Sequence, residues 1–199
     1  MALFISLWIK LFFVLTPFFA LTMFLSLTES YDEPRRRKLA MTVSAVVAAI
    51  CLLLFFAGNQ IFSLFGITLD SFRIGAGVLL MLSGIGLVHG KAAAASAAAE
   101  DDVAIVPLAI PIIVGPATTG TLLVMGAEMS TVSGKAVGVL ALLASVACIA
   151  AVLLAGSLIQ RWLGIRGIAI LSKLTGLILA ALAAQMIMTG IQGFLGTMS

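Results

Sequence analysis

Two residue pairs in this sequence could form anion-binding helix breaks: Thr16-Pro17 and Gly115-Pro116, each near the middle of an apolar run. Proline lacks the N–H group of a helical residue and clashes with the preceding turn, so each pair predicts an interrupted helix. The half-helix that follows would direct unpaired N–H groups and a partial positive charge toward the break, which suits a carboxylate. Because no glycine lies near Pro17 and two phenylalanines follow it, the first break is expected to be weaker or tighter than the second.

Hydroxyl and amide side chains lie close to these predicted breaks. Thr118 and Thr119 follow Pro116, and Gln185 is the deepest member of a polar stripe with Thr189 and Gln192, whose i, i+4, i+7 spacing shares one helix face. These groups could hydrogen-bond a polar solute. The alternative interpretation is structural, with threonines bonded to the preceding turn of a proline kink and the glutamine bonded to a neighbouring helix.

The ionisable and thiol side chains give no support to catalysis or metal binding. No Asp, Glu or His lies near the centre of an apolar run, and Cys51 and Cys148 each lie alone among apolar residues. We therefore predict no catalytic residue, no metal ligand and no cofactor, and expect that the chain is not an enzyme. Without a central carboxylate relay, the sequence leaves coupling to Na⁺ or H⁺ open.

Charged residues near the ends of the apolar runs have local interpretations. Asp70 and Arg73, at i and i+3, could cap a helix as an ion pair or act as a gating pair. Glu128 is expected to be solvated, and Lys10 is expected to extend its ammonium group to the membrane surface.

The elements that position these residues follow from composition. The chain has 199 residues, of which 62% are hydrophobic and 10% are charged, and its mean hydropathy is +1.27. Soluble domains carry more charge, so a soluble protein is excluded. Six apolar runs are each long enough to cross a bilayer as a helix, and they lack the alternation of a membrane barrel. The runs are 3–27, 39–57, 69–88, 103–127, 136–159 and 174–195. We predict an all-α polytopic membrane protein with a single transmembrane domain over residues 1–199.

The basic residues predict an orientation. Eight of the 11 Lys and Arg residues lie in the connections after the first, third and fifth runs, which the positive-inside rule assigns to the cytoplasm. Both termini are then expected in the periplasm. No basic stripe with interleaved aromatic residues is present, so a nucleic-acid partner is not expected.

An internal repeat is also predicted. Gly58 recurs as Gly156 at an offset of 98, and Thr16-Pro17 recurs as Gly115-Pro116 at an offset of 99. The first repeat covers about residues 1–90 and the second about 103–199. Each holds three runs, an odd number, so the second copy is inverted in the membrane, with broken helices 1 and 4. Inverted repeats are typical of secondary transporters; the alternative is a duplication kept only for packing.

Three stretches resemble the MarC family, which includes SnatA-like neutral amino-acid transporters: residues 65–77, residues 106–116 and residues 174–190. The resemblance implies an inner-membrane protein of six helices that carries glycine, alanine and similar solutes. Ala117 stands where the family has the second glycine of Gly-Pro-Gly. The predicted substrate-binding residues are Thr16, Pro17, Gly115, Pro116, Ala117, Thr118, Thr119 and Gln185.

Together these observations predict a secondary transporter that moves small neutral amino acids, or a similar small solute, across the bacterial inner membrane by alternating access. The alternative is a non-transporting membrane scaffold or regulatory protein. The expected partners are the lipid bilayer, a neutral amino acid and a coupling Na⁺ or H⁺, and the sequence leaves homo-oligomerisation open.

Overall fold

The computed structural model describes residues 2–90, 108–109 and 112–196. These residues form helices and no strand, which confirms the predicted all-α class. The helices are α1 (Ala2–Val14), α2 (Pro17–Leu27), α3 (Glu33–Phe65), α4 (Leu69–His89), α5 (Pro116–Glu128), α6 (Val132–Leu154) and α7 (Gly156–Gly196). Within the described part, five segments are long and apolar enough to span a membrane: α1 with α2, α3, α4, α6 and α7. The protein is therefore a multi-pass membrane protein.

The first span is broken where the sequence predicts. α1 ends at Val14, and α2 begins at Pro17 after Thr16, whose φ of 49° and ψ of 56° lie in the left-handed region. A non-glycine residue in this region is strained by about 1–3 kcal/mol. The break forms without a glycine, because Thr16 takes the reversed backbone that a glycine would adopt more easily.

The fourth span is also broken at the predicted pair. Gly115 is extended, with φ −84° and ψ −179°, and α5 begins at Pro116. Before it, the Val114 N–H donates to the Ala109 carbonyl at 2.9 Å, a wide turn that precedes the break. Pro107 and Pro111 lie outside the described residues.

Several helices are longer than their apolar runs. α3 extends over Glu33–Phe65, and α7 begins at Gly156 and continues through Gly164 (φ 67°, ψ 169°), where its direction changes. α6 ends at Leu154, before the predicted limit of that run. Hydropathy marks only the part of a helix that lies in hydrocarbon, whereas lysine and arginine are good helix formers outside it.

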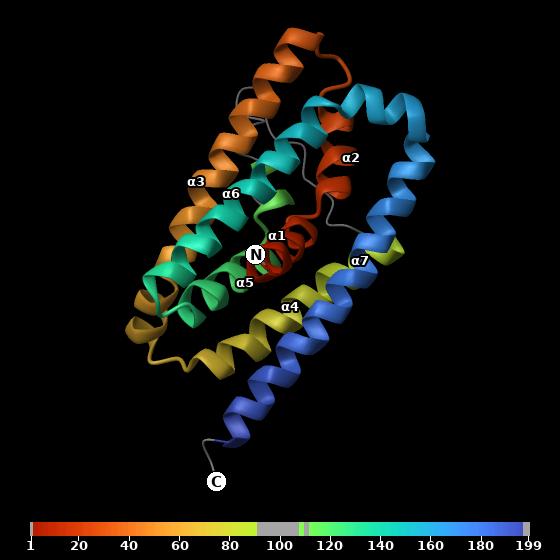
Figure 1. Ribbon diagram of the computed structural model, residues 1–199. Helices are drawn as coiled ribbons and strands as arrows, with labels where there is room; N and C mark the ends of the chain where they lie inside the picture. Colours follow the sequence, from red (N-terminus) through yellow and green to blue (C-terminus); the bar gives the residue numbers. More distant parts are fainter. Residues whose placement is uncertain (1, 91–107, 110–111, 197–199) are drawn as a thin grey trace.

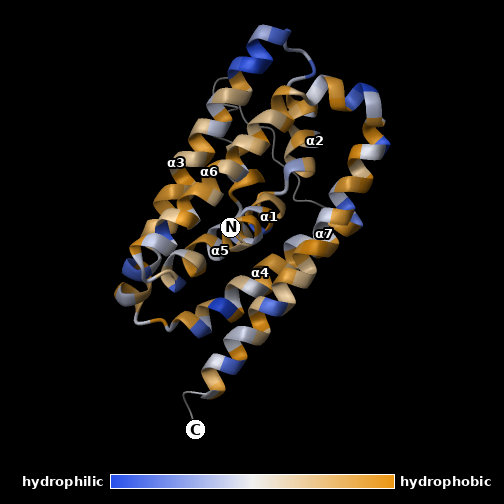
Figure 2. Ribbon diagram, viewed as in Figure 1, coloured by the Kyte–Doolittle hydropathy of each residue, from blue (hydrophilic) through white to orange (hydrophobic). Residues whose placement is uncertain are grey.

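Two long helix pairs frame the molecule (Figure 1). α4 and α7 lie side by side, as do α3 and α6, and α1, α2 and α5 lie between the pairs. Figure 2 shows that hydrophilic residues gather toward the helix ends and the turn in α7, with apolar residues along the middle. This distribution is typical of a membrane bundle.

Glycines set the closest helix contacts. A Cβ at Gly84 of α4 would lie 2.7 Å from the Gly176 carbonyl oxygen of α7, and one at Gly190 would lie 2.7 Å from the Asp70 carbonyl oxygen. At Gly126 of α5 a Cβ would lie 2.8 Å from the Phe55 carbonyl carbon of α3. Backbones approach this closely only where a side chain is missing, as is common between membrane helices.

Candidate functional site

The two helix breaks meet inside the bundle. The Thr118 hydroxyl of α5 lies 3.0 Å from the Ile113 carbonyl oxygen and 3.3 Å from the Val14 carbonyl oxygen. These carbonyls precede the second and the first break respectively, so neither has a regular helical partner. Thr118 is 3% exposed, and its single hydroxyl proton is shared between the two carbonyl oxygens that precede the breaks.

The residues predicted to bind a solute are not equally accessible. Most of those around the breaks are buried, and the half-buried ones are Gly115 and Thr119. Pro116 and Gln185 are exposed. The buried residues are Thr16, Pro17, Ala117 and Thr118. The structure thus brings the residues of the two breaks together in a closed contact and leaves Gln185 apart from this contact.

An open cavity of about 690 Å³ lies beside the breaks, between α1, α5 and α7. Phe13 and Thr121 are the lining residues nearest in the chain to the two breaks. Gln185 is the predicted site residue that lines this cavity. The remaining lining residues are Ser6, Leu7, Ile9, Lys10, Arg73, Val124, Met125, Glu128, Leu182, Met186 and Thr189.

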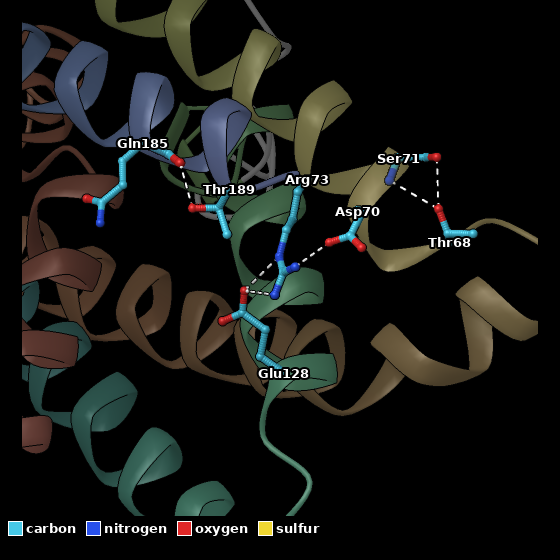
Figure 3. A network of polar contacts seen from close by, with 7 residues as sticks. All are labelled: Thr68, Asp70, Ser71, Arg73, Glu128, Gln185 and Thr189. Carbon is cyan, nitrogen blue, oxygen red and sulfur yellow. Dashed lines mark hydrogen bonds and ion pairs between the residues drawn. The ribbon is translucent and has the colours of Figure 1, made fainter. Parts of the chain in front are cut away.

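The cavity lining includes two residues of an ion-pair cluster, Arg73 and Glu128, and Figure 3 shows this cluster. Arg73 donates from Nε and Nη2 to Glu128 Oε1, at 3.0 and 2.9 Å, and from Nη1 to Asp70 Oδ1. The Arg73 side chain is 17% exposed. The Asp70–Arg73 pair is confirmed. Glu128 is exposed, as expected, and its carboxylate also bonds Arg73 and so joins α5 to α4. Arg73 and Glu128 are 55 positions apart in the chain, so their spacing in the sequence does not predict this pair.

The polar stripe of α7 is present at the cavity wall. Thr189 Oγ1 donates to the Gln185 carbonyl oxygen at 2.9 Å, a bond to the preceding turn that satisfies the hydroxyl. In Figure 3 the Gln185 amide extends away from this bond, and it is free to contact whatever fills the cavity.

No group of three or more His, Cys, Asp or Glu residues in the described part of the chain is arranged to hold a metal ion. Cys51 and Cys148 are free thiols.

Comparison with known proteins identifies the family. A family model described as MarC family integral membrane protein matches residues 1–195. The chain belongs to the MarC family. A MarC relative from Methanocaldococcus jannaschii, a UPF0056 membrane protein, is 38% identical over 94% of both chains. The UPF0056 inner membrane protein YhgN of Escherichia coli is 32% identical over 94% of this chain and 95% of its own.

A third MarC relative, a UPF0056 membrane protein of Pyrococcus abyssi, is 33% identical over 97% of this chain and 96% of its own. No solved structure matches the chain significantly. The resemblance noted in residues 65–77, 106–116 and 174–190 therefore extends over nearly the whole MarC chain.

Proposed function

We propose that this MarC protein is a secondary transporter that moves small neutral amino acids, such as glycine and alanine, across the inner membrane by alternating access. The cavity beside the two helix breaks carries the proposal. Its lining includes Phe13 and Thr121, which lie within one helical turn in the chain of Val14 and Thr118, the residues of the closed contact. A solute reaching that contact would cross the membrane once the contact parts.

Matching local structures support two similar halves. Gly66 and Gly164, 98 positions apart in the chain, both have a positive φ, of 62° and 67°, whereas ψ is 26° at Gly66 and 169° at Gly164. Thr22 donates to the Phe18 carbonyl, and Thr121, 99 positions later, donates to that of Ala117.

The contacts between helices repeat in the same way. A Cβ at Gly58 of α3 would meet the Leu123 backbone of α5, and one at Gly156 of α7 would meet the Leu21 and Leu25 side chains of α2. Each contact thus joins a helix of one half to the broken helix of the other half. This arrangement fits an inverted pair in which one three-helix unit rocks against its partner.

The proposed binding residues act in two groups. Gln185 contacts the solute in the conformation described here, because it lines the open cavity. The residues at the breaks, which are Thr16, Pro17 and the segment Gly115–Thr119, contact it as the two halves separate. The half-helix starting at Pro116 then offers free N–H groups to the solute carboxylate.

The orientation of the proposed transporter follows from its basic residues. With both termini in the periplasm, the cavity between Ser6 and Thr189 opens outward. The direction of net transport depends on the coupling ion, Na⁺ or H⁺, and imposed gradients of each ion across a vesicle membrane distinguish the two.

Flux in proteoliposomes tests the proposal. Purified protein is expected to give saturable uptake of radiolabelled glycine or alanine, and Gly115→Leu is expected to abolish it by filling the break with a bulky side chain. Gly75→Leu is the matched control, because nothing lies within 4 Å of a Cβ at Gly75. Absence of flux for every member of a neutral amino-acid panel would refute transport and favour the non-transporting scaffold.

A further inference from the structure

An unpaired lysine lines the cavity inside a membrane span. Ser6, Lys10 and Phe13 occupy one face of α1, at i, i+4 and i+7, and all three line the cavity. Lys10 is half-buried, and within residues 2–90, 108–109 and 112–196 no carboxylate pairs with it. Ionisable groups at such positions usually face a pathway or a partner, and here α5 and α7 form the opposite walls.

The rim of the same cavity has the opposite charge. Arg73 bonds two carboxylates, those of Asp70 and Glu128, so this cluster carries one surplus negative charge. Both bonds to Glu128 end on Oε1. Figure 3 shows its second oxygen directed away from Arg73, and the Glu128 side chain is 39% exposed.

The cavity is therefore dipolar, with a cation on its wall at Lys10 and surplus negative charge at the rim. From this geometry we propose that Lys10 binds the carboxylate of the solute while the ammonium group of the solute faces Glu128. The cavity then selects zwitterions. The inference rests on the proposed function and names the residues that recognise the substrate class.

Solutes with a single charge fit this arrangement less well. A monocarboxylate gains Lys10 but leaves Glu128 without a cation, and a simple amine meets the Lys10 charge in a region of low dielectric. The Gln185 amide and the Thr121 hydroxyl, which also line the cavity, can bond either end of a zwitterion.

Binding to the purified, full-length protein in detergent tests the inference separately from transport. The probes are alanine, propionate and ethylamine, which share a small apolar group and differ in charge. Wild-type protein is expected to bind alanine most tightly, propionate more weakly and ethylamine least. This ranking needs no variant, so it stands even if a substituted protein fails to fold.

Substitutions then assign the two charges. Lys10→Met is expected to weaken alanine and propionate binding about 10- to 100-fold, the range for losing a hydrogen bond to a charged group. Lys10→Arg is expected to retain most of the affinity. Glu128→Gln is expected to weaken alanine but not propionate. Lys135→Met is the control, because Lys135 lies on α6, away from the cavity lining.

The outcomes separate this inference from the proposed function. Alanine binding that depends on Lys10 without any flux would refute transport and leave the zwitterion site standing. Flux with unchanged affinity in Lys10→Met would overturn the site and leave transport standing. Wild-type protein that binds none of the three probes, or binds ethylamine best, would also overturn the site.

Discussion

Replacing Gly126 by alanine tests the closest helix contact in the bundle. A Cβ at Gly126 would lie 2.8 Å from the Phe55 carbonyl carbon and 3.3 Å from its Cα, and nearer still to its carbonyl oxygen. These are backbone atoms of α3, so no side-chain rotation relieves the clash. α5 would have to move away by roughly 1 Å to restore ordinary contact distances.

This displacement sets the expected magnitude. Overpacking in a core destabilises by about 1–3 kcal/mol, and we expect the upper end or more, because the same movement separates Gly58 from Leu123. The higher helix propensity of alanine offsets only about 0.5–1 kcal/mol. Gly75→Ala is the control, since a Cβ there meets nothing within 4 Å.

Thermal unfolding of the purified protein in detergent measures the difference. A loss of 1 kcal/mol lowers Tm by about 2–4 °C in a chain of this size, so Gly126→Ala is expected to lower Tm by about 6 °C or more. Gly75→Ala is expected to leave Tm unchanged or slightly raised. A wild-type Tm for Gly126→Ala, or an equal loss for Gly75→Ala, would show that α3 and α5 are not in the close contact described.

Three further predictions follow from the site and the topology. In a double-mutant cycle, Arg73→Gln and Glu128→Gln are expected to show a coupling free energy of about 1 kcal/mol, as for partly exposed ion pairs; strictly additive losses in thermal unfolding would show that the pair does not form. Thr118→Val is expected to cost about 1–3 kcal/mol, because two carbonyls lose their donor, whereas Thr118→Ser keeps the hydroxyl and most of the stability; equal losses in chemical unfolding would contradict this. In a background without the two native cysteines, Ser133→Cys is expected to react with an impermeant maleimide in intact cells and Ser30→Cys only after lysis; the reverse pattern would invert the topology.

The sequence predicts the interruptions of the bundle well because their causes are local. Proline removes a backbone donor wherever it occurs, so the ends at Thr16-Pro17 and Gly115-Pro116 are visible without any tertiary information. The left-handed backbone of Thr16 is not visible in this way, because neighbouring helices hold it against its own preference. Helix ends are also poorly predicted, since α7 continues through charged residues that hydropathy assigns to a connection.

In the candidate site, too, the features with local causes are predicted and those set by tertiary contacts are not. The Asp70–Arg73 pair is apparent from its spacing, but its third member, Glu128, comes from another helix. The role proposed for Lys10 is hard to predict for a related reason, because a charge near the end of a span resembles a surface anchor until the opposing walls of the cavity are known. The residues of the candidate site come from different helices, and a single sequence does not show which of them lie close together.

The length of α3 has a mechanical consequence for the surrounding lipid. Its 33 residues extend about 50 Å at 1.5 Å per residue, against a hydrocarbon core of about 30 Å. The chain turns at Gly164 of α7, where Trp162 is 81% exposed beside Arg161 and Arg166, a composition typical of the membrane–water boundary. A straight helix of the length of α3 either tilts in the bilayer or extends beyond its hydrocarbon core. A thinner bilayer is therefore expected to increase the tilt of α3 or the length of α3 that lies in water.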